Sequence, residues 1–210
     1  MTHRLSRFFV RTWPLLLALA VLAVTPVALS QTREGRVAVR ASIYLPDMVL
    51  QVPLPWRPIE LISDPPARER VLIQYESRDG PRTLEADLYT PAGDATDRHG
   101  VVFSMGAPPL DLDDKRLVRI AEDSARAGAV MLVPFSERLD DERIEPEEID
   151  ALVAAFKFLQ AQPSVDPNKV GFFGASVGGS LAIVAAADSR IASDVDHVVS
   201  FGGYFDALYT

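Results

Sequence analysis

The stretch Val170-Gly171-Phe172-Phe173-Gly174-Ala175-Ser176-Val177-Gly178-Gly179 decides the fold of this chain. An apolar run opens it, the pattern G-x-S-x-G occupies its middle, and small residues continue as far as Ala187. This order predicts a strand, a very tight turn and a helix, which is the setting of a nucleophile elbow. Ser176 would then stand on a strained turn, with Gly174 and Gly178 beside it because larger side chains would collide there.

Strands continue on both sides of this stretch. Two runs, Arg70–Glu76 and Leu84–Leu88, alternate apolar and polar residues around the turn signal Asp79-Gly80-Pro81, so they predict an antiparallel hairpin. The other apolar runs are short and continuous, which is typical of parallel strands that are covered on both faces. These runs are Val101–Phe103, Val130–Val133, Val170–Phe173 and Val198–Val199.

Helical patterns separate the apolar runs. The spacing from Leu117 to Ser124 predicts a helix, with Asp113 or Asp114 as its cap and Gly128 as its stop. A second helix begins near Pro146 and carries one apolar stripe, and a third covers Val177 to about Ala187. This alternation predicts the α/β class, a mostly parallel sheet with flanking helices.

Composition excludes several classes of function. The 210 residues include no Cys, so the chain has no disulfide framework or thiolate site. The histidines His3, His99 and His197 leave little material for a metal cluster, and we expect no metal and no cofactor. From residue 31 onward 18 Lys and Arg residues stand against 29 Asp and Glu residues. Such an acidic body repels phosphate backbones, so we expect no nucleic-acid partner.

The N-terminal region 1–32 has the layout of an export signal or a membrane anchor. Arg4, Arg7 and Arg11 precede residues 12–32, which carry no charge. Small residues near Ser30 suit a cleaved signal peptide, whereas 21 uncharged residues in a helix reach about 31 Å, enough to span a bilayer core. Both alternatives predict an apolar N-terminal helix and place the body outside the cytoplasm.

Residues 33–69 predict a spacer. Six prolines fall between Pro46 and Pro66, which forbids a long helix and favours extended chain. Residues 70–210 then remain for the domain itself. Nothing in the pattern indicates an oligomeric state.

The chain resembles the α/β-hydrolase superfamily, and within it the dienelactone-hydrolase and prolyl-oligopeptidase-like group. The resemblance rests on the elbow and on the segment Gln162–Gly171 that leads into it, and it covers roughly residues 70–206. It implies that Ser176 is the nucleophile and that the Val177 N–H is one oxyanion donor. The second donor in the family comes from the loop after an earlier strand, where Ala107 is our candidate.

The resemblance also implies an acid and a histidine base after the elbow. The single histidine there, His197, opens a strand about five residues, or roughly 16 Å, from the edge that bears Ser176. It is therefore out of hydrogen-bond reach, and no catalytic histidine is visible. Asp206 follows that strand and is our candidate for the acid. We expect the chain to be part of a longer hydrolase whose last strands are missing.

Together these features predict a serine hydrolase-like protein that acts on an ester or a related small acyl substrate, with Ser176 attacking the carbonyl. The alternative is a non-catalytic envelope protein that uses the same scaffold for binding. The membrane would be a partner only through an uncleaved N-terminal segment.

Overall fold

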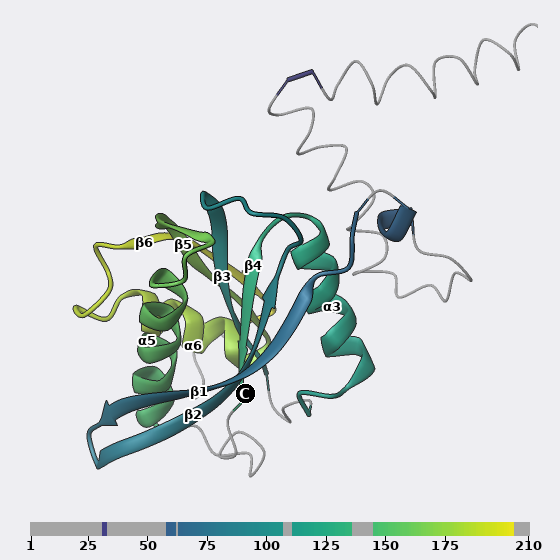
Figure 1. Cartoon of the computed structure of the whole chain (residues 1–210). Helices are drawn as coiled ribbons and strands as arrows, with labels where there is room; N and C mark the ends of the chain where they lie inside the picture. The colour runs from purple at the N-terminus through teal and green to yellow at the C-terminus, as the bar shows by residue number, and fades with distance from the viewer. Residues whose placement is uncertain (1–30, 33–57, 62, 107–110, 136–144, 204–210) are drawn as a thin grey trace, which may run out of the picture. The chain divides into compact units, whose positions relative to one another are not determined.

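A six-stranded sheet is the frame of the fold (Figure 1). The computed structural model describes residues 31–32, 58–61, 63–106, 111–135 and 145–203. The chain divides into two compact units, Met1–Arg57 and Pro58–Thr210, and the elements described here belong to the second. Its strands are β1 (Ala67–Ser77), β2 (Gly80–Thr90), β3 (Arg98–Ser104), β4 (Val130–Pro134), β5 (Val165–Ala175) and β6 (Val195–Phe201). The helices are the 3-10 helix η1 (Pro58–Leu61), α3 (Lys115–Arg126), α5 (Glu147–Gln160) and α6 (Val177–Ala186).

The hairpin expected around Asp79-Gly80 is formed by β1 and β2. These strands pair antiparallel from Ala67 opposite Thr90 to Ser77 opposite Gly80. Gly80 has a φ of 109°, a conformation that glycine adopts at no steric cost. The alternating apolar residues of β2 are buried, so the period-two pattern marks the face that meets the core.

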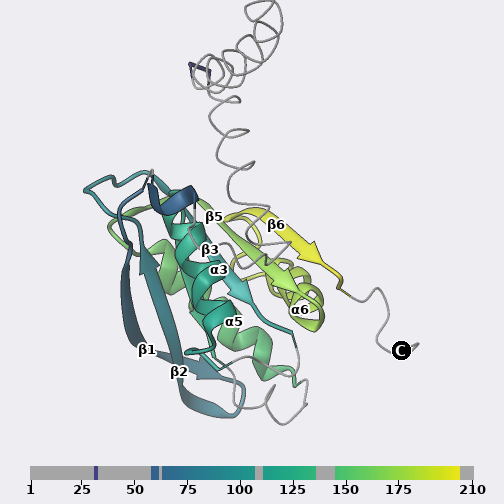
Figure 2. The ribbon, with the colours of Figure 1, turned by 90° about the vertical axis from the view of Figure 1, so that its right-hand side faces the viewer.

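The order of the strands is β1-β2-β4-β3-β5-β6. β2 pairs antiparallel with β4, whereas β4, β3, β5 and β6 run parallel to one another. The hairpin and β6 therefore lie at opposite edges of the sheet (Figure 2). This arrangement confirms the predicted mostly parallel α/β sheet.

Helix boundaries follow the signals in the sequence. Asp114 caps α3 by accepting a hydrogen bond from the Arg116 N–H, and the chain turns at Gly128, whose φ is 109°. α5 begins directly after Pro146, with three acidic residues in its first turn, where the positive end of the helix dipole favours them. α6 follows Ser176 without an intervening loop.

Two apolar clusters cover the two faces of the sheet. α5 and α6 lie on one side and α3 on the other (Figure 1). Neighbouring residues of one strand serve different clusters: Phe172 of β5 stacks on Phe156 of α5, and Phe173 stacks on Phe103 of β3. Strands buried on both faces explain why the apolar runs of the sequence are continuous.

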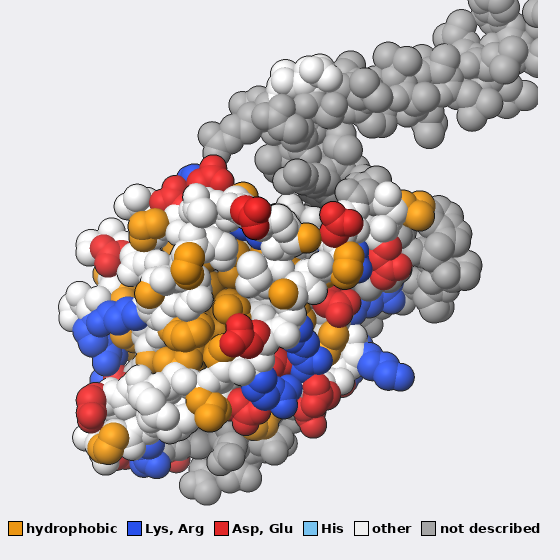
Figure 3. All heavy atoms as spheres, in the orientation of Figure 1, with side chains coloured by type: hydrophobic (Ala, Val, Ile, Leu, Met, Phe, Trp, Pro, Cys, Tyr) orange, Lys and Arg blue, Asp and Glu red, His pale blue; other side chains and the backbone are white. Residues whose placement is uncertain are grey.

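Charged side chains of both signs share the surface. On the face shown in Figure 3, basic side chains lie next to acidic ones, so that face presents no continuous basic surface within the described chain. Within the ranges that the structure describes, no helix is long and apolar enough to span a membrane. The predicted signal or anchor helix in region 1–32 and most of the predicted spacer 33–69 lie outside the described residues.

Candidate active site

Ser176 occupies the turn between β5 and α6. Its φ is 55° and its ψ is −130°, and it is the non-glycine residue with a positive φ among the residues that the structure describes. A non-glycine residue in this region stores about 1–3 kcal/mol of backbone strain, which surrounding contacts must hold. The structure therefore has the strained strand–turn–helix geometry that the G-x-S-x-G pattern predicts.

The two flanking glycines have no room for a side chain. A Cβ on Gly174 would lie 2.4 Å from the carbonyl oxygen of Gly178. A Cβ on Gly178 would lie 2.2 Å from the carbonyl oxygens of both Ser104 and Met105. All of these neighbours are backbone atoms, so the close approach of α6 to β5 and to the end of β3 requires glycine at both positions.

Gly106, which follows β3 and Met105, lies beside Ser176. A Cβ placed on Gly106 would lie 2.8 Å from the Ser176 Cβ and 3.3 Å from its Oγ. The backbone at Gly106 is thus next to the hydroxyl. The resemblance indicates this loop, but the contact between Gly106 and Ser176 was not predicted, because the two residues follow separate strands.

Backbone hydrogen bonds fix the elbow on both sides. The Ser176 N–H donates to the carbonyl oxygen of Phe201, the last residue of β6, over 2.8 Å. The Ser176 carbonyl accepts from the Gly179 N–H over 2.9 Å. Val177 is the first residue of α6, so its N–H belongs to the positive end of that helix. A negative charge that develops on an acyl oxygen beside Ser176 would be stabilised there.

Two predicted site residues lie outside the described residues: Ala107, the candidate second oxyanion donor, and Asp206, the candidate acid. His197 does lie near the start of β6, opposite Gly171 of β5. Ser176 follows the far end of β5, where Ala175 pairs with Phe201. His99 lies at the start of β3, opposite the same region of β5. In the part of the chain that the structure describes, both histidines therefore lie at the amino ends of their strands, and Ser176 lies at the opposite, carboxyl end of β5.

The buried charges of the hairpin belong to the scaffold. Asp87 of β2 is 1% exposed and accepts hydrogen bonds from Arg68 and Arg70 of β1. The Asp87 carboxylate raises the pKa of the Arg70 guanidinium, and burial raises the pKa of the nearby Tyr89 to about 12. Arg70 and Tyr89 therefore stay protonated at neutral pH, and the hydrogen bonds to Asp87 tie β1 to β2 rather than to the elbow.

Known proteins share this architecture, although no protein-family model matches the chain. The polyketide transferase claH of Penicillium crustosum is 30% identical over 125 residues, which are 56% of this chain and 40% of that protein. A dienelactone hydrolase from Anabaena variabilis is 29% identical with a TM-score of 0.52, over 66% of this chain and 64% of its own. An esterase from Pyrobaculum calidifontis is 22% identical with a TM-score of 0.51, over 81% and 53%.

The chain has the α/β-hydrolase fold. It spans less than two thirds of the length of each of the three proteins.

Proposed function

We propose that the protein is a serine hydrolase that cleaves an ester or a related small acyl substrate. The observation that carries this proposal is the backbone of Ser176, whose positive φ presents the side chain at the junction of β5, α6 and the loop after β3. The name of one relative supports the substrate class, because a dienelactone is a cyclic ester.

The proposed reaction is acyl transfer to water. The Ser176 Oγ attacks the carbonyl carbon and forms a tetrahedral intermediate, the alcohol leaves with a proton, and water then releases the acid from the acyl-enzyme. The Val177 N–H and a second N–H from the loop after β3, for which Ala107 is our candidate, would hold the oxyanion. Asp206 is the proposed acid, and it would orient the histidine base that the resemblance implies. Three arginines ahead of the uncharged segment 12–32 support activity outside the cytoplasm.

An activated-serine probe tests the proposal directly. We expect a fluorophosphonate to label the protein produced from its own complete gene, and Ser176→Ala to abolish labelling. The same substitution should lower hydrolysis of a p-nitrophenyl ester by at least about a thousandfold, because the acyl-enzyme can no longer form.

Ser193→Ala is the matched control, because Ser193 is exposed on the segment between α6 and β6 and should leave labelling unchanged. Labelling that persists in Ser176→Ala would assign the reactive group to another residue. A folded protein that takes up no probe and hydrolyses no ester would instead favour the alternative, a non-catalytic binding protein on the same scaffold.

A further inference from the structure

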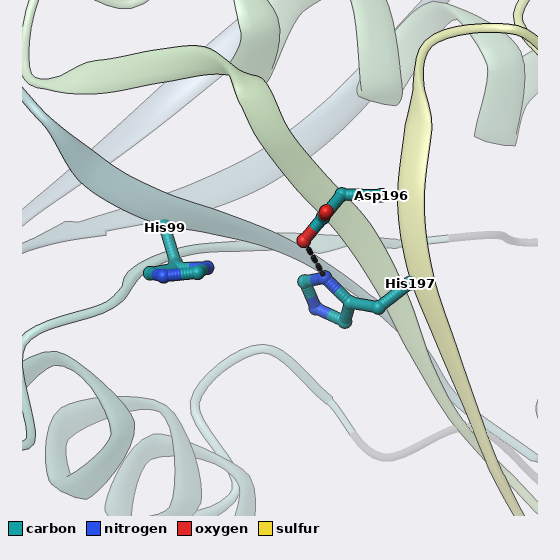
Figure 4. Close-up of side chains that lie close together, drawn as sticks. All are labelled: His99, Asp196 and His197. Atoms are coloured by element: carbon teal, nitrogen blue, oxygen red, sulfur yellow. Dashed lines mark hydrogen bonds and ion pairs between the residues drawn. The ribbon is translucent and has the colours of Figure 1, made fainter. Parts of the chain in front are cut away.

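Two histidines and an aspartate meet at the amino ends of two strands that flank a third. His99 comes from β3, and Asp196 and His197 come from β6, with β5 between them (Figure 4). One donor atom from each of the three side chains lies within 4.8 Å of the other two. The two imidazole rings are 6.3 Å apart between centroids. The three residues lie at the amino ends of the strands and Ser176 lies at the carboxyl end, so the proposed hydrolysis does not use them.

Irregular strand pairing brings these side chains together. β5 and β6 pair at Val170 with Val195 and then at Gly171 with His197, so Asp196 is the extra residue of a bulge. Consecutive side chains of a regular strand point to opposite faces. The bulge removes that alternation, and the Asp196 Oδ2 lies 3.0 Å from the His197 Nδ1. His99 likewise lies where the pairing of β3 with β5 shifts register.

Gly171 leaves the space that the His197 ring fills. A Cβ at this position of β5 would come within 2.7 Å of two atoms of the imidazole, Cγ and Cε1. The missing side chain lets the ring lie over the middle strand, between β6 and β3, on the side where His99 stands (Figure 4). Strand β5, which lies between the two histidine-bearing strands, thus has no side chain at Gly171 that would separate the two rings.

We propose that His99, Asp196 and His197 bind a divalent transition-metal ion of the Zn²⁺ class. Imidazole nitrogen and carboxylate oxygen are the ligands that Zn²⁺ takes in proteins, and three such ligands leave a fourth position for water. Two donor atoms that are each about 2.0–2.1 Å from a tetrahedral ion lie roughly 3.4 Å apart. The side chains of His99 and Asp196 are exposed and can rotate, and the proposed ion would draw donor atoms that now lie within 4.8 Å of one another to this shorter spacing.

Metal titration tests the proposal. The full chain is prepared without a polyhistidine tag, dialysed against a chelator and titrated with Zn²⁺ by calorimetry and with Co²⁺ by visible absorption. We expect one equivalent to bind, with the absorption of four-coordinate Co²⁺. His99→Ala, His197→Ala and Asp196→Asn should each weaken binding at least about tenfold, because each removes one ligand. Bound Zn²⁺ should also raise the Tm of the wild-type chain.

His3→Ala is the matched control, since it removes the remaining histidine and should leave the affinity unchanged. Absence of binding by the wild-type chain would overturn the proposal, as would equal affinity in the three ligand variants or an equal loss in His3→Ala. Asp196→Asn preserves side-chain shape and serves if a histidine variant does not fold. In that case, Zn²⁺ must also shift the NMR signals of the His99 and His197 rings and not those of His3.

Discussion

The residues at the two ends of the parallel strands are positioned in different ways. At the carboxyl end, Ser176 is positioned mainly by its own neighbours in sequence, because the turn and the flanking glycines lie within ten consecutive residues. At the amino end, His99 and His197 are almost a hundred residues apart and meet because β5 lies between their strands. A site of the first kind is therefore visible in the sequence, and one of the second kind depends on strand order and register.

Adding a side chain near Ser176, at the carboxyl end of β5, should destabilise the protein most, and we expect the largest loss of stability from Gly178→Ala. The new Cβ would meet the carbonyl oxygens of Ser104 and Met105, and backbone atoms cannot rotate away. We expect the free energy of unfolding to fall by about 3 kcal/mol or more, measured by urea denaturation.

Gly179→Ala is the control at the next position of α6. Its Cβ would lie 2.5 Å from the Ser200 hydroxyl, which can turn aside, and its nearest backbone neighbour, the Gly174 carbonyl oxygen, would be 3.2 Å away, against 2.2 Å at Gly178. Alanine also favours the helix. We expect a loss of about 1 kcal/mol or less. Equal losses in the two variants would mean that contact with the β3 backbone does not set the spacing of α6.

The strain at Ser176 should invert the usual ranking of glycine and alanine. Because glycine tolerates a φ of 55°, we expect Ser176→Gly to be more stable than Ser176→Ala by about 1 kcal/mol in thermal denaturation. At Ser180, inside α6, alanine should be more stable than glycine by about 1 kcal/mol. The same order at both positions would show that the elbow is not strained.

The smallest expected effect concerns an ion pair at the amino end. The hydrogen bond from Lys169 holds the pKa of the Asp166 carboxyl below its ordinary value of 3.8, over an Nζ–Oδ2 distance of 2.8 Å. A depressed pKa contributes stability that is present above the pKa of the unfolded chain and is lost as the pH falls through the folded value. Lys169→Met should let the Asp166 pKa rise toward 3.8 in an NMR titration.

Lys157→Met is the matched control for this titration, because Lys157 is exposed on α5 and lies outside the pair. It should leave the Asp166 pKa unchanged. An Asp166 pKa that does not move in Lys169→Met would mean that Asn168, the other hydrogen-bond donor, carries the shift.

Local patterns predicted most of the fold. The alternating residues of β2, the cap of α3 and the proline ahead of α5 mark elements within a few residues, since each signal acts through neighbours in the chain. The apolar run at Val170 gave only the centre of β5, which extends from Val165 to Ala175. Strand edges rich in polar residues, such as Asp166 to Lys169, carry no hydrophobic signal.

The candidate sites divide in the same way. The strained turn at Ser176 was predictable because a glycine pattern defines it, and the approach of Gly106 was not because it joins separate strands. His197 was predicted to open its strand, and the three histidines were judged too few for a metal cluster. His197 does lie near the start of β6, but the bulge at Asp196 and the missing side chain at Gly171 bring it close to His99, and neither feature has a signature in a single sequence.

The hydrogen bond from the Ser176 N–H to Phe201 links the strained turn to the opening of strand β6. β6 is the edge strand of the described sheet, and its side chains at Val198, Val199 and Phe201 are exposed. Edge strands open more readily than central ones, because fewer contacts hold them. Fraying of β6 at Phe201 would release the Ser176 amide, so the hydrogen-exchange rate of that one amide reports how readily this hydrogen bond opens.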